Sequence, residues 1–459
     1  MYRQAAPTMP PSGHLSETAM PSVADLTATE ALSQIKSGDL TSTALVQACL
    51  DRISEREPAL HAWQYLDPEH ALRQARALDK AQADGEPLGR LHGLPVGIKD
   101  IINTGDMPTE SGTPFFKDHQ PEEDARCVAM LREAGAVIMG KTVTTELAAL
   151  APSKSRNPVN SAHTPGGSSA GSGAAVGSNM VPLALGTQTG GSVIRPGSFC
   201  GVHALKPTVG FIPRRGVTLQ SHTLDTVGVY GRSVEDLALI SDATSEFEAG
   251  DAFSYARAAP NLTDALSGPG STSVKLAFWK TPGWDLADDK AQAALSDFAS
   301  GLGRDCSPVE IAAAQNVSVD HKYIQAAENA HYYGPLYDRD KSLLTDDLRG
   351  RMAVALETSA RDYLGAVERR DQHYRAVADV LDQFDAILCL SAAGPAAHGY
   401  ASTGNPVFNG LWTYLGVPCI SLPLLTIDDM PLGVQLVGKR REEAKLLQTA
   451  KWLEGRVSA

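Results

Sequence analysis

The sequence has few of the features that mark nucleic-acid-binding, disulfide-bonded or membrane-spanning proteins. Its 459 residues include 40 Lys and Arg against 53 Asp and Glu, a formal charge of −13. No basic excess therefore exists to displace counterions from phosphates. The six cysteines are scattered, and no pair has the CxxC spacing of a zinc site. No apolar run approaches the roughly 20 residues that cross a bilayer, and the N-terminus lacks the apolar core of a secretory signal. We expect an acidic, cytoplasmic, globular protein without a metal site.

The alternation of short apolar runs with helical patterns predicts the α/β class. Residues 23–84 are predicted to be helical, with Thr27 and Glu30 forming a capping box. Strands are predicted at 93–100, 136–139, 275–279, 386–390 and 430–437. Further helices are predicted at 125–134, 144–150, 233–243, 292–302, 352–384 and 442–455. No repeat or linker divides the chain. We expect a flexible leader, residues 1–22, and one large domain, residues 23–459.

Residues 165–216 are rich in Gly, Ser, Pro and Thr, a composition that also suits a flexible linker. Apolar stretches such as 174–176 and 181–185 lie between the glycines, and a linker would not carry them. Dense glycine inside a globular region indicates that the backbone approaches itself or a ligand closely. We therefore expect this segment to be folded and functional.

Two short motifs match formally but lack the required context. Gly135–Thr142 has the letters of a phosphate-binding loop, yet the residues between its glycines, Ala-Val-Ile-Met, are typical of a strand. Gly167–Gly171 has the letters of a nucleophile elbow, but no apolar strand precedes it. The histidines that could complete a catalytic triad, His203, His222 and His398, have no supporting context. We expect neither an NTPase nor an α/β-hydrolase.

A third pattern combines distant residues. Lys99 ends the apolar segment Gly-Leu-Pro-Val-Gly-Ile-Lys-Asp, Ser168 lies 69 positions later in Gly-Gly-Ser-Ser-Ala-Gly, and Ser192 follows 24 positions after that in Gly-Thr-Gln-Thr-Gly-Gly-Ser. With these spacings, and with matching segments at 224–236, 409–418 and 433–438, the chain resembles the amidase signature family from about Val23 to Glu454. The resemblance implies a single α/β domain with a central mixed β-sheet covered by helices on both faces.

The resemblance also implies the role of each site residue. Ser192 is the expected acyl nucleophile, Lys99 the base, and Ser168, after a cis peptide bond from Gly167, the serine that bridges them. The expected oxyanion hole comprises Thr189, Gly190, Gly191 and Ser192. Supporting roles are expected for Gly167, Ser169 and Arg195.

The chemistry of these residue types agrees with that assignment. A serine hydroxyl becomes a good nucleophile only when a base takes its proton. A lysine buried among apolar neighbours has a lowered pKa and can serve as that base at neutral pH. A middle hydroxyl can pass the proton to the leaving amine, and glycine N–H groups can stabilise the oxyanion. Such a reaction needs no metal or organic cofactor.

Two positions depart from the family pattern. Gln188 stands where the family commonly has Asp, and Arg195 lies three residues after the nucleophile where the family commonly has two. Neither change touches the relay, but both leave the subgroup open. We expect a serine hydrolase that cleaves C–N bonds of small amides, with esters and carbamates (urethanes) as further substrates of the same chemistry. The alternatives are the glutaminase subunit of a tRNA-dependent amidotransferase and a catalytically idle scaffold.

The substrate pocket is expected to come from less patterned segments, namely 107–116, 321–337 and 392–412. Their aromatic content favours an aryl or alkyl substrate. As partners we expect a small-molecule substrate, with no nucleic acid and no membrane, and a monomer or homodimer.

Overall fold

A computed structural model describes residues 22–268 and 273–458 of the chain. Of the predicted leader, residues 1–22, only Ser22 is among them, and the rest lies outside the described residues. Ser22 accepts a hydrogen bond from the Ala24 N–H and caps a short 3-10 helix, Val23–Asp25. Thr27 and Glu30 form the predicted capping box at the start of the first α-helix.

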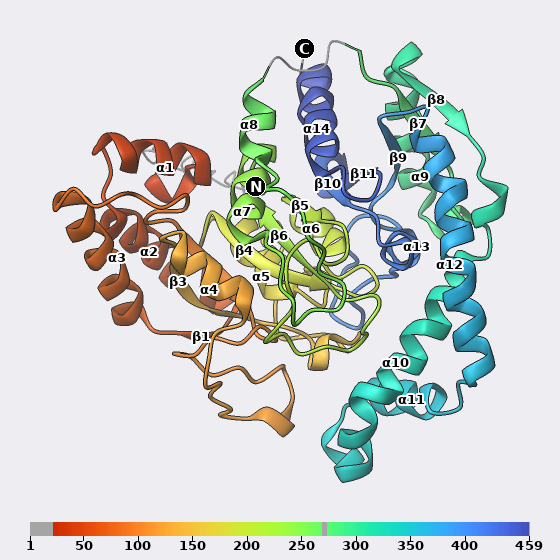
Figure 1. Cartoon of the computed structure of the whole chain (residues 1–459), viewed down its shortest axis with the longest axis horizontal. Helices are drawn as coiled ribbons and strands as arrows, with labels where there is room; N and C mark the ends of the chain where they lie inside the picture. Colours follow the sequence, from red (N-terminus) through yellow and green to blue (C-terminus); the bar gives the residue numbers. More distant parts are fainter. Residues whose placement is uncertain (1–21, 269–272, 459) are drawn as a thin grey trace, which may run out of the picture.

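Eleven strands of the described chain form one mixed sheet (Figure 1). They are β1 (Trp63–Leu66), β2 (Pro95–Lys99), β3 (Val137–Thr142), β4 (Leu183–Gln188), β5 (His203–Lys206), β6 (Thr226–Gly231), β7 (Leu276–Trp279), β8 (Cys306–Val309), β9 (Ala386–Leu390), β10 (Cys419–Ile427) and β11 (Met430–Val437). Their order is β1-β3-β2-β4-β6-β5-β10-β11-β9-β7-β8. The pairs β2–β3, β2–β4, β7–β8 and β7–β9 are parallel, and the others are antiparallel.

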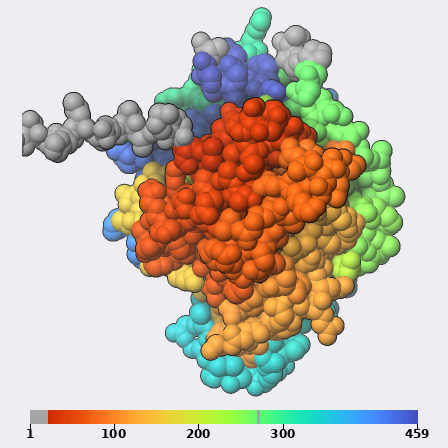
Figure 2. Space-filling model, turned by 90° about the vertical axis from the view of Figure 1, so that its left-hand side faces the viewer, coloured from red at the N-terminus to blue at the C-terminus, as the bar shows by residue number. Residues whose placement is uncertain are grey.

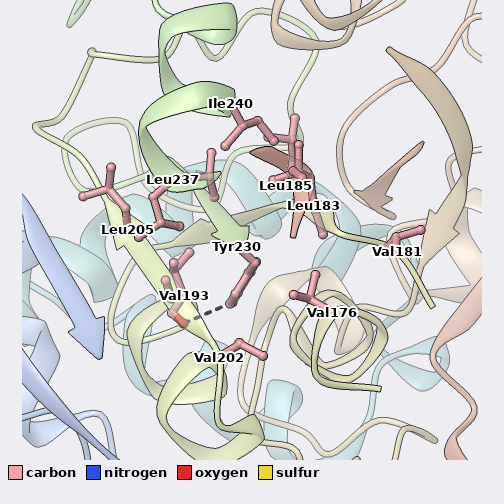
Figure 3. Close-up of a cluster of buried hydrophobic side chains, with 14 of the residues drawn as sticks. Val176, Val181, Leu183, Leu185, Val193, Val202, Leu205, Tyr230, Leu237 and Ile240 are labelled. Carbon is pink, nitrogen blue, oxygen red and sulfur yellow. Dashed lines mark hydrogen bonds between the residues drawn. The ribbon is translucent and has the colours of Figure 1, made fainter. Parts of the chain in front are cut away.

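Helices cover both faces of the sheet, as expected. They are α1 (Ala28–Ser37), α2 (Ser42–Leu60), α3 (Pro68–Ala83), α4 (Arg126–Glu133), α5 (Ala170–Gly177), α6 (Ile194–Cys200), α7 (Val234–Thr244), α8 (Leu262–Ser267), α9 (Asp289–Gly301), α10 (Val317–Asp340), α11 (Asp346–Ala355), α12 (Ala360–Leu381), α13 (Val407–Leu415) and α14 (Glu443–Ser458). Figure 3 shows Leu237 and Ile240 of α7 above the central strands, with Tyr230 pointing the opposite way toward Val193 and Val176. Because successive side chains of a strand point to opposite faces of the sheet, β6 and its neighbours contribute side chains to the hydrophobic packing on both faces.

Two buried parallel strands bring the distant site residues together. All residues of β2 and β4 are buried, and Ile98 pairs with Leu185. The carboxyl ends of parallel strands lie at the same edge of a sheet, where open α/β sheets bind ligands. Lys99 is the last residue of β2. Gln188 is the last residue of β4 and is followed by the glycine loop, residues 189–192. The fold therefore places Lys99 beside the segment that carries Ser192.

The structure corrects several predicted elements. Residues 144–150 form no α-helix but only a short 3-10 helix, Glu146–Ala148, because Leu147 and Ala148 have φ angles of 46° and 55°, in the left-handed region. Strand β1 interrupts the predicted helical region 23–84, because α2 ends at Leu60 and the residues of β1 pair with β3. Residues 356–359 separate α11 from α12 inside the predicted helix 352–384. Helices α10 and α13 lie in segments for which we predicted no helix.

Helices α10 and α11 form an arm at one side of the molecule (Figure 1). Its apolar residues, Tyr333, Leu348 and Met352, pack with Leu147 and Ala149. Phe115 and Phe116, and Leu336 and Tyr337 of α10, join the same cluster, and Figure 2 shows the arm directly below the loop that follows β2. The arm therefore packs against the loops that follow β2 and β3. None of the helices within residues 22–268 and 273–458 is long and apolar enough to cross a membrane.

Candidate active site

Lys99 is a fully buried lysine at the end of β2. Its Nζ lies 2.7 Å from Ser168 Oγ and 2.8 Å from Thr187 Oγ1. Burial lowers the pKa of Lys99 well below 10.5, and the negative charge of Asp225 opposes that shift. No carboxylate in the described part of the chain forms an ion pair with the amine. Lys99 therefore has surroundings that favour the uncharged amine, the form in which a lysine can accept a proton.

Ser168 follows a cis peptide bond from Gly167, as the resemblance implied. The backbone around it is held from two sides, since Thr145 N–H donates to Ser168 O at 3.2 Å and Arg195 Nη2 donates to Gly167 O at 2.6 Å. Ser169 lies on the far side of this turn, where its hydroxyl contacts the backbone of Thr187 at 3.2 Å. The Gly167 carbonyl and the Ser169 hydroxyl therefore each have hydrogen-bond partners next to Ser168, in contacts that a sequence pattern does not show.

Ser192 ends the glycine loop that connects β4 to α6. It is only 4% exposed. Its carbonyl accepts a hydrogen bond from the Tyr230 hydroxyl at 3.3 Å. Within residues 22–268 and 273–458, Ser192 Oγ makes no hydrogen bond, so the structure brings Lys99 and Ser168 into contact but shows no bond from Ser168 to Ser192. Catalytic hydrogen bonds are often long without substrate and shorten when it binds.

The glycine loop presents backbone donors without protein partners. No acceptor among the described residues engages the N–H groups of Gly190, Gly191 or Ser192. The side chain of Thr189 is turned away from them, because its hydroxyl donates to Asp225 Oδ1. Gly191 also leaves no room for a side chain, since a Cβ there would lie 2.4 Å from Asn409 Oδ1. The loop has the free, adjacent donors that stabilising an oxyanion requires.

The two residues that depart from the family pattern are both buried and bonded. Gln188 Oε1 accepts the N–H groups of Val193 and Ile194 at 2.9 and 3.0 Å, and so holds the start of α6. Arg195 has no carboxylate partner within the described ranges; its Nε donates to Thr403 O at 2.7 Å. Burial lowers the pKa of Arg195 to about 10. Arg195, on α6, therefore donates hydrogen bonds both to the carbonyl of the cis peptide, Gly167 O, and to the backbone of Thr403.

Asp225 and Thr187 belong to the site, although we did not predict a role for either. Asp225 accepts the N–H groups of Gln220 and Ser221 at 2.8 and 3.1 Å, in addition to the Thr189 hydroxyl. Its burial raises its pKa. Thr187 belongs to the site because its hydroxyl accepts a hydrogen bond from Lys99 Nζ at 2.8 Å. No sequence motif marks it, since it lies inside β4, three positions before the first glycine of the loop.

The structure agrees with our rejection of the two short motifs. The phosphate-loop letters fall on β3, where Lys141 is buried and donates to Ile102 O at 2.8 Å. The residues before the nucleophile-elbow letters form turns and bends, not a strand. No cluster of three His, Cys, Asp or Glu that could hold a metal is found among the described residues.

A cavity of about 610 Å³ lies between α10, α11 and the turn after Thr145. Lys322, Gln325 and Asn329 of α10 line one side, from the predicted pocket segment 321–337. Gln220 and Leu150 also line it. Lys322 is exposed and has no ion-pair partner in the part of the chain that the structure describes. This wall carries amide and charged side chains where we expected aromatic ones.

Comparison with known proteins shows the family. A protein-family model described as "Amidase" matches residues 44–447. A glutamyl-tRNA(Gln) amidotransferase subunit of Oleidesulfovibrio alaskensis is 31% identical, over 94% of this chain and 97% of that protein. The equivalent protein of Natranaerobius thermophilus, which bears the same name, is 30% identical, with 94% and 95% covered. The chain is therefore an amidase-type protein over nearly its whole length.

Solved structures agree with that class. Native peptide amidase from Stenotrophomonas maltophilia has a TM-score of 0.81 and 28% identity, covering 95% of this chain and 98% of that one. A chain of an inhibitor-bound vestigial complex, related to the origins of an s-triazine catabolic enzyme, has a TM-score of 0.88 and 26% identity, with 94% and 99% covered. The chain belongs to the amidase signature family, a family of hydrolases.

Proposed function

We propose that the protein hydrolyses small amides through an acyl-enzyme formed on Ser192. The observation that carries the proposal is the contact between the buried Lys99 amine and Ser168 Oγ, at 2.7 Å, beside a loop with free N–H donors. During attack, Ser168 accepts the Ser192 proton while passing its own to Lys99. The reverse transfer protonates the leaving amine, and water then hydrolyses the ester by the same route.

We propose that the cavity between α10 and α11 binds a polar small molecule as the substrate. Lys99, Ser168 and Ser192 do not line it, but Gln220, which does, donates its backbone N–H to Asp225 of the site. Gln325, Asn329 and Lys322 offer donors and acceptors, and Ala326 and Val354 add apolar surface. A volume of about 610 Å³ suits a small molecule and not a folded protein domain. Esters and carbamates are further candidate substrates, because the acyl-serine chemistry is the same.

Proposed partners follow from the same features. The negative charge of −13 favours a small-molecule substrate over a nucleic acid. The site residues all come from one chain, so a monomer or homodimer would suffice for activity.

A panel of primary amides, aryl amides, esters and carbamates tests the proposal. Wild type should turn over at least one amide, and Ser192→Ala should remove that activity while leaving the melting temperature unchanged. A fluorophosphonate should label wild type and not Ser192→Ala. If no amide is hydrolysed, or if Ser192→Ala keeps its rate, the proposed reaction is wrong.

A second candidate is the glutaminase subunit of a tRNA-dependent amidotransferase. Relatives of about 30% identity bear that enzyme's name over nearly the full chain. Gln188 and the shifted Arg195 count against it. Glutamine as the preferred substrate, together with co-purification of partner subunits from the native cell, would favour this role over a stand-alone amidase.

A further inference from the structure

Three carbonyl groups of the glycine loop are each held by a donor. His321 Nε2 lies 2.9 Å from Thr189 O, and Thr413 Oγ1 lies 2.9 Å from Gly190 O. The third donor is local, since Arg195 N–H reaches Gly191 O at 3.0 Å. A carbonyl oxygen only accepts, so His321 carries its proton on Nε2 and donates it.

These donors set the direction of the N–H groups. The only cis peptide in the described chain precedes Ser168, so the peptides of the loop are trans. In a trans peptide the C=O and N–H bonds point in opposite directions. A donor that holds Thr189 O therefore turns the Gly190 N–H to the other side, and a donor that holds Gly190 O does the same for the Gly191 N–H. Consecutive N–H groups on one side form an anion-binding concavity.

The donors on His321 and Thr413 come from two helices that are packed together. His321 lies on α10 and Thr413 on α13, and a Cβ at Gly410 of α13 would lie only 3.2 Å from His321 Nδ1. The glycine at 410 thus lets the imidazole lie flat against α13. His321 is 6% exposed, and burial lowers its pKa, which favours the neutral ring; the neutral tautomer with its proton on Nε2 still donates to Thr189 O.

Gln188 donates to the Thr413 hydroxyl, whose own proton is then available to a carbonyl. Gln188 Oε1 faces two backbone N–H groups, so its amide nitrogen must face Thr413, at 3.0 Å. That N–H donates to Thr413 Oγ1, so the hydroxyl proton goes to a carbonyl, and Gly190 O at 2.9 Å is nearer than Asn409 O of the same helix at 3.3 Å. An aspartate at this position could hold the start of α6 but could not donate to Thr413. The departure from the family pattern thus has a structural role.

We infer that His321 and Thr413 are positioning residues that orient the oxyanion hole by holding the carbonyl groups of Thr189 and Gly190. The inference rests on the proposed acyl-transfer function. Neither side chain reaches the reacting atoms; each acts through the peptide that it holds. Loss of either donor lets its peptide rotate and moves one N–H away from the developing oxyanion.

Paired variants separate the donor from the shape of the side chain. His321→Phe and Thr413→Val keep the size but remove the donor, whereas His321→Gln and Thr413→Ser keep a donor. His331→Phe, at an exposed histidine of the same helix, is the matched control. Each variant is first checked for an unchanged melting curve and circular dichroism spectrum.

The first measurement is kinetic, with the best amide of the panel. The donor-free variants should lose about 10- to 100-fold in kcat with little change in KM, less than the about 10²- to 10³-fold that deletion of an oxyanion donor causes. Affinity for a boronic acid, whose adduct with Ser192 carries a tetrahedral anion, should fall in parallel. His321→Gln, Thr413→Ser and His331→Phe should stay near wild type. Near-normal kcat in both donor-free variants, or equal losses in the donor-keeping ones, would overturn the inference.

The second measurement is independent of turnover. Crystal structures of His321→Phe and Thr413→Val should show the 189–190 and 190–191 peptides rotated, respectively. Unchanged peptide planes in both would overturn the inference even if the amidase reaction holds. Conversely, rotated planes in a protein that hydrolyses no amide would uphold the positioning role and reject the proposed function.

Discussion

Lys99→Met tests whether the amine is truly unprotonated in the folded protein. Methionine fills a similar volume without a charge. The wild-type amine is fully buried and hydrogen-bonded only to the hydroxyls of Ser168 and Thr187 among the described residues. Because burial lowers the pKa of Lys99 well below 10.5, folding must release a proton at any pH between the folded and the unfolded pKa of this lysine.

The magnitude follows from two opposing terms. Loss of two hydrogen bonds, at about 1 kcal/mol each, makes the variant less stable by about 2 kcal/mol at high pH. Below the unfolded pKa of about 10.4, the unfolded wild type binds more protons than the folded one. As the pH is lowered from about 10.4 to the folded pKa, the free energy of unfolding of wild type therefore decreases by about 1.4 kcal/mol per pH unit. The free energy of unfolding of the variant does not change in this way, because the variant has no amine at this position. The two curves should cross near about pH 9.

Urea denaturation at pH 8, 9 and 10 measures both curves. At pH 8 the variant should be the more stable protein by about 1 kcal/mol, while its amide turnover is about 10²- to 10⁴-fold lower. Stability curves that stay parallel across this range would show that the amine keeps its proton, and the relay would then lack a base. Lys141→Met is the comparison variant, because Lys141 is also buried but lies 3.5 Å from the buried Asp100. Burial lowers the pKa of Lys141 to about 8, so below pH 8 this lysine is charged and its loss leaves a carboxylate unpaired. At pH 7 this variant should therefore be destabilised by about 3 kcal/mol.

Three further outcomes are expected. Gly191→Ala should lose at least about 100-fold in kcat, because the new Cβ would lie 2.4 Å from Asn409 Oδ1 and displace the oxyanion donors; a rate near wild type would show that the loop can adjust. Arg195→Lys should lower both the melting temperature and kcat, since one ammonium cannot reproduce the planar donor set that holds Gly167 O; unchanged values would remove Arg195 from the support of the cis peptide. Thiol titration of the native protein should label at most Cys306, the one cysteine of the six that is not fully buried, and activity should survive alkylation. Inactivation by alkylation would instead implicate a thiol.

The sequence was sufficient to predict the parts of the fold whose signals are local. The strand predictions 386–390 and 430–437 match β9 and β11 in both bounds, because short apolar runs between turn signals have few other uses. The segment 144–150 failed for a tertiary reason. Tyr333 OH donates to Leu147 O at 2.6 Å and Gln220 Nε2 to Ala148 O at 3.0 Å, and these distant donors hold the left-handed backbone. Propensity within seven residues cannot anticipate them.

The candidate site divides in the same way. The sequence by itself determined which residues were candidates for the chemistry, since Lys99, Ser168 and Ser192 stand in segments and at spacings that resemble those of the amidase signature family. Only the tertiary structure decided what surrounds them. The contact between His321 and Thr189 spans 132 positions along the chain, and that between Thr413 and Gly190 spans 223. Such pairs meet only when the helices pack, because single polar side chains on α10 and α13 carry no pattern that names their partners.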